Sequence, residues 1–529
     1  MSSDTESPVA SKPAKPIRRF GTGLLSIIQV ICVLVIYMAA NYLGAIHHAP
    51  KDLSSEAAYT LSSATRHYLE SAAVKDRPDT IIMEVAFRRS SPIYEKVSVL
   101  AEEYSRLSHG KVEVKMFDPV SQQDKAQQVA DRFGPVYGAA NKTIFNTDLI
   151  IVDARKQEDR EKGKAATTLT SADPHIRFVE AEMMGRFETD QRGQRRLTGF
   201  RGEDAITAAL VGAIEGKARE VYLLLDKSGY TVNSDDGVLA NFEKILLTQN
   251  MIVRGKRMSE MDRIPDDAAA VAILNPAYDF SPTEIKALED YWNRARSGIF
   301  ITLGASETPP NLRAFLRNQG ITPGNDRVLT TKGPQVITTV RGSFEYGWDF
   351  TEDFAGKAVI LEGATCSLIV QDKNNDELAR RGIMPMVLAK SAPEFWGETR
   401  FAVPNPVFQA SEDVKGPPPD GKLPLIAGVI RGSAARDDVG DQVSRMTVAA
   451  NSDFLAPKYL SDINRNFATS SMNWLMGREE LTGEGPLTLG TYKLPLLDSE
   501  VSFINRVNLF FLPAFALMIG AIVWSSRRA

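Results

Sequence analysis

The sequence is poor in cysteine, the residue that cross-links small folds through disulfides and binds metal clusters. Only two of its 529 residues are cysteine, Cys32 and Cys366, which excludes a disulfide scaffold and a four-cysteine metal site. Neither sign of charge dominates, because 62 Lys and Arg stand against 66 Asp and Glu. A nucleic-acid partner is therefore not expected, since it would require a strongly basic face.

Several catalytic and cofactor motifs are also missing. The chain has no Gly-x-x-x-x-Gly-Lys-Ser/Thr phosphate loop, no Gly-x-Gly-x-x-Gly after a strand, and no Gly-x-Ser-x-Gly nucleophile elbow. All five histidines precede residue 176: His47, His48, His67, His109 and His175. Cys366 therefore has no general base nearby in sequence, and we interpret it as part of a strand core. The sequence predicts no catalytic, cofactor or metal residue and no enzyme activity.

The composition is that of a globular protein. Apolar residues make up 43% of the chain and charged residues 24%, which suits packed domains better than disorder. A length of 529 residues suggests about three units. The mean hydropathy of −0.18 excludes a transporter with many spans.

Two apolar stretches at the ends of the chain predict membrane spans. Neither the stretch 21–46 nor the mostly apolar stretch 507–524 contains a charged residue. About 20 apolar residues suffice to cross a bilayer as a helix, so we expect two transmembrane helices. A cleaved signal peptide is the alternative for the first stretch, although its apolar region is usually shorter. Residues 1–20 are expected to be disordered.

Basic residues flank both stretches on their outer sides and predict the orientation. Lys12, Lys15, Arg18 and Arg19 precede the first, and Arg527 and Arg528 follow the second. Because basic flanks stay cytoplasmic, both termini are expected in the cytoplasm, and the bulk of the chain outside it. The predicted location is the bacterial inner membrane, with a periplasmic domain that contacts lipid only through the two spans.

The segment 52–215 predicts a thioredoxin-like α/β domain. Strands around 80–87, 111–117 and 148–152 alternate with helices around 94–107 and 124–133. A redox member of this class would carry Cys-x-x-Cys after the first strand. Residues 88–92 there read Arg-Arg-Ser-Ser-Pro, so disulfide exchange is excluded.

The segment 216–490 predicts a Rossmann-like domain, similar to glutamine-amidotransferase folds, with a parallel sheet. Buried strands are expected at 219–225, 269–274, 299–304 and 446–451, with helices between them. The helix that begins after Ser281 carries a capping box with Pro282 and Glu284. An insertion from about 330 to 440 is expected to be rich in β-structure.

Ligands of open parallel sheets bind beyond the carboxyl ends of the strands. Asp226, Asn275, Gly304 and Asp453 follow four of the predicted strands, so we predict a candidate interaction surface there. For Asp453, and for Glu203 in the other domain, a capping or turn role is the competing interpretation.

A series of short motifs occurs in order along the chain: Leu53 with Tyr59-Thr60-Leu61-Ser62, the strand 111–117 ending in Asp118-Pro119, residues 200–210, Asn275-Pro276 with Phe280-Ser281, Asn451-Ser452-Asp453-Phe454 and Asn473-Trp474-Leu475. In this order, between two apolar ends, they resemble the auxiliary subunit of the gliding-motility-type ABC transporter family. Two positions depart from the family pattern. Residues 226–230 replace a Gly-His-Gly-Glu-like turn, and Ser297-Gly298 replaces a glycine pair.

The resemblance implies a non-catalytic, membrane-anchored subunit whose partners are a separate ABC permease and a separate ABC ATPase. Gliding itself is not implied. Two other hypotheses remain open. One is an extracytoplasmic module that binds a ligand or a glycan. The other is a hydrolase or amidotransferase-like enzyme, for which Ser306 after Gly304-Ala305 is the only nucleophile at a strand-to-helix turn.

Overall fold

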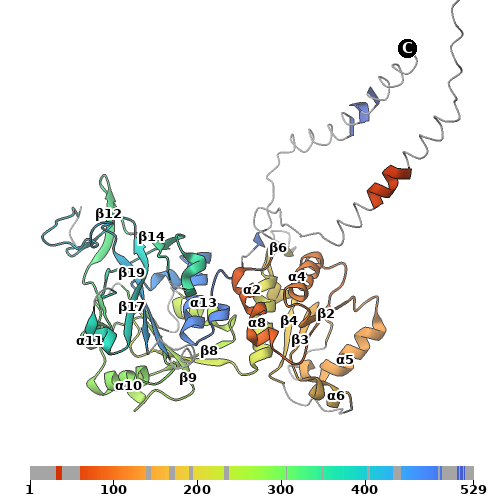
Figure 1. The fold of residues 1–529 in the computed structure, drawn as a ribbon, viewed down its shortest axis with the longest axis horizontal. Helices are drawn as coiled ribbons and strands as arrows, with labels where there is room; N and C mark the ends of the chain where they lie inside the picture. The colour runs from red at the N-terminus through yellow and green to blue at the C-terminus, as the bar shows by residue number, and fades with distance from the viewer. Residues whose placement is uncertain are drawn as a thin grey trace, which may run out of the picture. The chain divides into compact units, whose positions relative to one another are not determined.

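The computed structural model describes the following residues: 31–38, 60–138, 144–165, 173–189, 195–231, 237–304, 307–347, 349–372, 375–401, 406–432, 443–486, 489–490, 509–510, 513–515 and 517–518. The chain from residue 59 onward groups into one compact unit, and residues 1–58 into another. Within the larger unit, two sheets have separate apolar cores (Figure 1). We call residues 60–218 the N-terminal lobe and residues 219–486 the C-terminal lobe.

The prediction of two transmembrane helices is wrong for the part of the chain that is described. Of the first predicted span, 21–46, only 31–38 is described as a helix, and most of the second, 507–524, lies outside the described residues. A helix over 31–38 rises about 12 Å, whereas the hydrocarbon of a bilayer is about 30 Å thick. No described helix combines the length and the apolar composition that a membrane crossing needs. This finding overturns the two spans in the predicted fold class and the predicted inner-membrane location.

The N-terminal lobe is built on a four-stranded sheet in the order β2-β1-β3-β4. Strand β1 pairs parallel with β2 and antiparallel with β3, which pairs antiparallel with β4. The apolar residues 81–86 and 149–153 make β1 and β3 fully buried central strands. The strands are β1 (Ile81–Ala86), β2 (Val112–Phe117), β3 (Leu149–Asp153) and β4 (Ile176–Glu180).

Helices cover both faces of this sheet. Helices α2, α4 and α8 pack on one face, where Tyr104 and Leu210 lie in the core, and α5 covers the other face with Phe133. A short hairpin of β5 and β6 precedes α8. The elements are α2 (Ser63–Glu70), α3 (Ala72–Lys75), α4 (Tyr94–Leu107), α5 (Gln123–Gly138), α6 (Gln157–Ala165), α7 (Ala181–Met184), β5 (Gly185–Thr189), β6 (Arg195–Phe200) and α8 (Gly202–Glu215).

The C-terminal lobe contains a nine-stranded mixed sheet in the order β15-β14-β17-β19-β20-β10-β9-β7-β8. The five strands from β20 to β8 are parallel to one another, and the pairings from β15 to β20 are antiparallel. The parallel strands are β7 (Arg219–Leu224), β8 (Met251–Lys256), β9 (Ala268–Leu274), β10 (Gly298–Thr302) and β20 (Ser444–Ala449). The antiparallel part contains β14 (Val340–Phe344), β15 (Ala358–Leu361), β17 (Ile383–Ser391) and β19 (Pro424–Arg431).

The expectation of a parallel sheet with a separate β-rich insertion is therefore corrected. The residues from about 330 to 440 are rich in strands, but four of these strands extend the main sheet. They can do so because β17 and β19 are apolar enough to be buried against the same core as β20. Smaller sheets are formed by β11 (Ile321–Pro323) with β16 (Leu368–Val370), and by β12 (Arg327–Lys332), β13 (Gln335–Ile337) and β18 (Trp396–Glu398).

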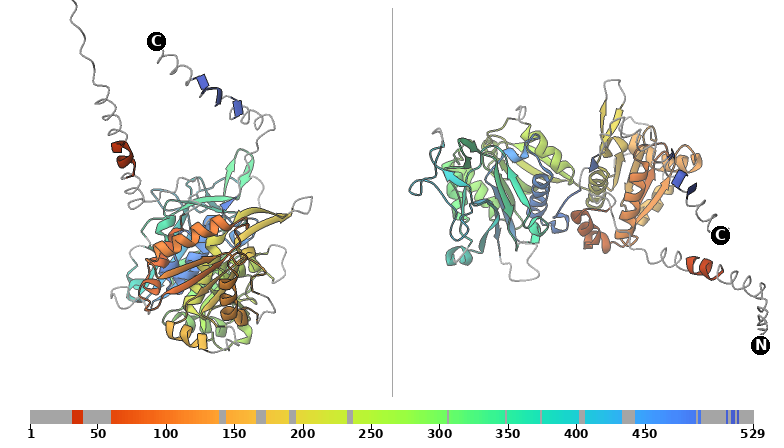
Figure 2. Two further views of the ribbon diagram at one scale, coloured as in Figure 1. Left: turned by 90° about the vertical axis from the view of Figure 1, so that its right-hand side faces the viewer. Right: turned by 90° about the horizontal axis from the view of Figure 1, so that it is seen from above.

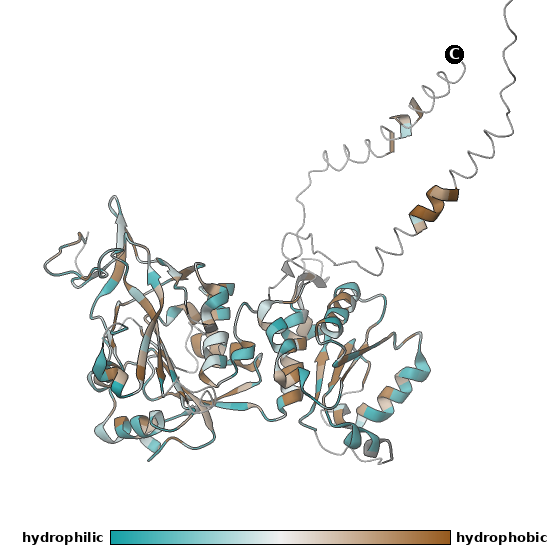
Figure 3. Ribbon diagram, in the orientation of Figure 1, coloured by the Kyte–Doolittle hydropathy of each residue, from teal (hydrophilic) through white to brown (hydrophobic). Residues whose placement is uncertain are grey.

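Both faces of the large sheet are covered (Figure 2). Helices α9 and α13 pack on one face through Phe242 and Phe467, and α10 and α11 on the other through Trp292 and Phe315. The strands are accordingly apolar, whereas the helices carry hydrophilic residues on their other sides (Figure 3). The remaining elements are α9 (Val238–Leu247), η1 (Met258–Glu260), α10 (Pro282–Trp292), α11 (Pro310–Asn318), η2 (Asp349–Phe354), α12 (Asp376–Arg380), η4 (Asp453–Leu455), α13 (Asp462–Leu475), η5 (Glu479–Leu481) and β21 (Leu489–Gly490).

The capping box at α10 is confirmed. The Ser281 hydroxyl accepts a hydrogen bond from the Glu284 backbone N–H at 3.3 Å, and the Glu284 carboxylate accepts one from the Ser281 N–H at 2.7 Å. Pro282 occupies the first turn, where its missing N–H costs nothing.

One buried arginine connects the two lobes. The guanidinium of Arg478 is 1% exposed and lies 3.1 Å from the carboxylate of Glu215, the last residue of α8. It also donates to the Gln249 carbonyl at 3.0 Å and to the Asn473 side-chain oxygen. Glu215 also pairs with Arg219 at 3.3 Å, but that side chain is 39% exposed and screened by solvent. Removing the buried partner therefore costs up to about 3–5 kcal/mol.

We therefore expect Arg478→Met to lower the free energy of unfolding by up to about 3–5 kcal/mol, because Glu215 then loses its buried cation. Urea unfolding of the full chain measures this loss. The control is Arg254→Met, since Arg254 is half exposed and lies 3.8 Å from Glu220; its loss should cost at most about 1 kcal/mol. Equal costs for the two variants would contradict a special role for Arg478.

Candidate functional site

The carboxyl ends of the parallel strands place three of the four predicted surface residues at one edge of the sheet, where the Asn275 side chain lies against Gly304. Asn275 directly follows β9, Gly304 lies two residues beyond β10, and Asp453 lies four residues beyond β20. Asp226, two residues beyond β7, is committed to a different contact. That a ligand binds at this edge of the sheet stays a prediction.

Asn275 fills the space between two glycines. Its backbone is left-handed, with φ of 47°, and its carbonyl accepts a hydrogen bond from the Gly229 N–H at 2.7 Å. A Cβ atom on Gly304 would stand 1.7 Å from the Asn275 side-chain oxygen, and one on Gly229 would stand 2.9 Å from its amide nitrogen. Only glycine at these positions lets the asparagine lie across the strand ends.

Asp453 is held by both carboxylate oxygens. One accepts a hydrogen bond from the Tyr230 hydroxyl at 3.1 Å, and the other from the Ala364 N–H at 3.2 Å. Gly363, with φ of 83°, makes room for it, because a Cβ there would stand 2.0 Å from the carboxylate. Asp453 thus fixes the turn after β15, in agreement with the turn role that was the competing interpretation.

Asp226 caps a short 3-10 helix instead of joining the other three. Its carboxylate accepts from the backbone N–H groups of Met258 and Ser259 at 2.8 and 3.0 Å. Burial opposes ionisation, but these hydrogen bonds and Lys227 hold the pKa of Asp226 below its usual value. The Lys227 ammonium lies 2.9 Å from Glu284 and 3.8 Å from Asp226. Asp226 therefore belongs to a group of three paired charges.

Two further residues reach this edge without a signal in the sequence. The Arg327 guanidinium lies 3.4 Å from the Gly304 carbonyl and 5.0 Å from the Phe401 ring. Asp326 accepts from the Ser367 N–H and hydroxyl at 2.8 and 2.7 Å, while burial raises its pKa. Their positions depend on β12, which the sequence placed only within a β-rich insertion.

The candidate nucleophiles have no supporting chemistry in the described residues. Cys366 is buried, its sulfur lies 3.8 Å from the Ala450 carbonyl, and burial raises the pKa of the thiol to about 12. It remains protonated at neutral pH, as expected for a core cysteine. Ser306 lies outside the described residues. Among the described residues, no group of three or more His, Cys, Asp or Glu side chains could hold a metal ion.

Glu203, the other acidic residue singled out from the sequence, caps α2. Its carboxylate accepts from the Ser62 N–H and hydroxyl at 2.8 and 2.6 Å. Burial raises its pKa, although the bonds from Ser62 partly offset this effect. The capping interpretation is therefore the one that the contacts support.

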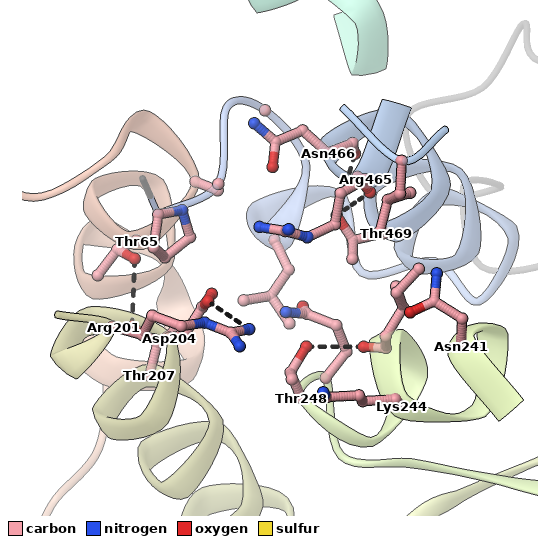
Figure 4. Close-up of a pocket in the computed structure, with 18 residues that line it drawn as sticks. Thr65, Arg201, Asp204, Thr207, Asn241, Lys244, Thr248, Arg465, Asn466 and Thr469 are labelled. Carbon is pink, nitrogen blue, oxygen red and sulfur yellow. Dashed lines mark hydrogen bonds and ion pairs between the residues drawn. The ribbon is translucent and has the colours of Figure 1, made fainter. Parts of the chain in front are cut away.

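A second polar region lies between the lobes and was missed from the sequence. It is a cavity of about 100 Å³ lined by α2, α8, α9 and α13 (Figure 4). Its lining is mostly polar: Thr65, Arg201, Asp204, Thr207, Asn241, Lys244, Thr248, Gln249, Arg465, Asn466 and Thr469. These residues are far apart in the sequence and share no motif, so no local pattern could have identified the cavity.

Comparisons with known proteins find only weak structural similarity. No family model matches the chain, and no curated protein matches it. A solved structure described as the mmIFT52 N-terminal domain is 13% identical, with a TM-score of 0.33 over 48% of this chain and 96% of that one. A putative ThuA-like protein from Bacteroides uniformis is 12% identical, with a TM-score of 0.29 over 49% of this chain and 92% of that one. Likenesses this weak carry no argument about fold or function.

The fit of Asn275 against Gly304 gives the first prediction for this region. Gly304→Ala should destabilise the chain by about 1–3 kcal/mol, because the new methyl group overlaps the Asn275 side chain. In an Asn275→Gly background the same change should cost much less, since the overlapping group is gone and the left-handed backbone suits glycine. Urea unfolding of the four proteins in this cycle measures the coupling.

Gly134→Ala is the control for that cycle, because a Cβ there would meet only Ile144, at 3.9 Å. It should not destabilise the chain, and should stabilise it by at most about 1 kcal/mol, because alanine is favoured over glycine within a helix. Equal costs of Gly304→Ala with and without the Asn275 side chain would contradict the contact.

The buried carboxyl of Glu203 predicts a pH dependence. Because its folded pKa is raised by burial, its contribution to stability is full below the unfolded value of about 4.3 and is lost as pH rises through the folded pKa. Glu203→Gln keeps an oxygen acceptor for Ser62 and has no such loss. The stability of the variant relative to wild type should therefore increase with pH, in urea unfolding between about pH 4 and 8.

Glu243→Gln on the exposed side of α9 is the matched control, and its curve should run parallel to wild type. A constant difference between Glu203→Gln and wild type over this range would show that Glu203 does not titrate with a raised pKa.

Proposed function

We propose that the chain is a non-catalytic auxiliary subunit that acts together with a separate ABC permease and a separate ABC ATPase. The sequence resemblance suggests these partners, and one observation carries the non-catalytic part. Charged groups at the carboxyl ends of the parallel strands bind other protein groups: Asp453 accepts from Tyr230, and Lys227 pairs with Glu284. The Asn275 side chain packs beside Gly304. Groups engaged in this way hold loops in place, which suits a scaffold.

The connection between the lobes supports the same role. Arg478, Glu215 and Asn250 form a network across the junction, in which the Asn250 amide donates to Glu215 at 2.9 Å. A buried ion pair with these additional hydrogen bonds is costly to break. A body that keeps its shape can present separate surfaces to two partner subunits.

Exposed apolar side chains offer a surface for such a partner. Phe401 and Val407 are 49% and 70% exposed, and Phe408, at 39%, contacts the edge of the Trp396 ring. The three residues are close in sequence, and exposed large apolar side chains are a feature of protein-binding sites. We assign the contact with the permease to this apolar surface, defined by Phe401, Val407 and Phe408.

A pull-down of the tagged full-length chain from detergent-treated native cells tests the proposal. The expected result is recovery of an ATPase and a permease in near-equal amounts, identified by mass spectrometry. Val407→Asp should reduce their recovery several-fold, because a charge in an apolar contact must be desolvated. Tyr278→Asp, at a residue that is 62% exposed elsewhere on the same lobe, should not.

Recovery of the chain alone, with neither partner, would contradict the proposed function. Equal loss of partners in both variants would contradict the assignment of the apolar surface. The stability of each variant, measured by urea unfolding, separates loss of contact from loss of fold.

The second candidate function is a module that binds a small ligand. One observation favours it: the polar cavity between the lobes, which contains groups without protein partners.

A further inference from the structure

We propose that the polar cavity between the lobes is a binding site for a small oxyanion, namely a phosphate group that is either free or carried on a short polyol. This inference does not depend on the proposed transporter partners. It rests on the charges that line the cavity, on donors that lack protein acceptors, and on the size of the space.

Positive charge predominates in the lining. Arg201 from the start of α8, Lys244 from α9 and Arg465 from α13 line the cavity, and Asp204 is the one acidic residue among the lining residues described. Asp204 lies 3.4 Å from Arg201, and Arg465 lies 3.2 Å from Asp462. Lys244 has no ion-pair partner among the described residues. An anion in the cavity would therefore be attracted, and a cation repelled.

Several donors of the cavity are incompletely used. Among the residues that the structure describes, the buried Nε atom of Arg201 has no hydrogen-bond partner, and the guanidinium makes one long contact, to Asp204 at 3.4 Å. The Nη1 atom of Arg465 is likewise buried and makes no hydrogen bond with a described residue, although it lies 3.2 Å from Asp462. Buried polar groups without partners cost free energy. A ligand that accepts hydrogen bonds would remove this cost.

Asn466 is a further polar group of this site. Its side chain is 5% exposed and lines the cavity alongside the charged groups (Figure 4). The neighbouring Thr469 hydroxyl donates to the main-chain carbonyl of Asn466 at 3.0 Å and to that of Arg465 at 3.2 Å. These bonds lie in the first half of α13, the part of the helix from which Arg465, Asn466 and Thr469 line the cavity.

The size of the cavity limits the ligand. Its volume of about 100 Å³ is well below the roughly 300–1,000 Å³ of sites for drug-sized molecules. An oxyanion carries several acceptor oxygens in a compact volume, which matches guanidinium and amide donors placed around a small space. Thr65, Thr207 and Thr248 also line the cavity. Their hydroxyls already bond one another, Tyr104 and the Ile245 carbonyl, and each oxygen keeps a lone pair that can accept from the hydroxyl of a short polyol.

Binding would join the two lobes. Arg201 and Asp204 belong to the N-terminal lobe, whereas Lys244, Arg465 and Asn466 belong to the C-terminal lobe. A ligand held by both sets would stabilise the folded chain in proportion to the logarithm of its concentration. The same ligand could therefore be detected by stability as well as by heat of binding.

Isothermal titration and thermal unfolding of the full chain test the site, with inorganic phosphate and with glycerol phosphate as separate probes. Sodium chloride at the same ionic strength and pH provides the reference. We expect saturable binding and a rise in Tm with phosphate that chloride does not reproduce. Binding of both probes would show that the phosphate group suffices, and binding of glycerol phosphate alone would assign the group to a polyol.

Two variants locate the binding. Arg465→Gln should raise the Kd about tenfold, since it removes a charged donor. Lys244→Gln should raise it about threefold, because this side chain is exposed and makes a screened contact. Lys286→Gln is the matched control: Lys286 is an exposed lysine on α10 of the same lobe, outside the cavity lining. It carries the same change of charge and should leave the Kd unaltered.

An equal effect of chloride and phosphate on Tm, with no heat of binding, would overturn the proposal and indicate a cavity that holds water only. An equal rise of Kd in Lys244→Gln and Lys286→Gln would also overturn it, since the effect would then come from net charge. If Arg465→Gln fails to fold, Lys244→Gln still decides the outcome, because Lys244 has no structural partner among the described residues. Failure of phosphate binding leaves the pull-down of partner subunits unaffected, so the two proposals can fail separately.

Discussion

The buried guanidinium of Arg478 is the constraint on which the arrangement of the two lobes depends. A charge that is 1% exposed must keep its partners, and these partners come from three separate elements. Glu215 ends α8, Gln249 follows α9, and Asn473 lies in the last turn of α13. The Asn473 amide in turn donates to the Gln249 side chain and to the Leu481 carbonyl, both at 3.0 Å. The same three helices, α8, α9 and α13, line the polar cavity, so the pair that joins the lobes also fixes the cavity walls.

The two polar regions of the molecule differ in their charge. At the carboxyl ends of the parallel strands, Asp226, Asp453 and Lys227 each bind protein groups, and the buried side-chain oxygen of Asn275 makes no hydrogen bond with a described residue. In the cavity, Arg201, Lys244 and Arg465 stand against one acidic lining residue, Asp204. Because the surplus of positive charge lies in the cavity, the first region is suited to holding loops and the second to receiving an anionic ligand. The rule that ligands bind at strand ends applies to folds in which that edge is left open, and here it is filled.

Local patterns in the sequence predicted most of the elements well. The apolar spacing of 94–107 and the capping box before 282–292 gave helices with the observed bounds, because caps and periodicity act within one or two turns. The buried strands at 219–224 and 268–274 followed from their continuous apolar runs. The spans predicted from composition at 21–46 and 507–524 are the main error, since the described helices there are too short to cross a membrane.

The sequence by itself determined which segments form strands and helices, which of their faces are buried, and which redox and nucleotide motifs are missing, because each of these depends on neighbouring residues. Only the tertiary structure decided that β14, β15, β17 and β19 extend the main sheet, that Asn275 lies against Gly304, and that Arg201, Lys244 and Arg465 line one cavity. These contacts join residues far apart in the chain. The stability of these contacts depends on how whole elements pack, which cannot be predicted from a local pattern of residues.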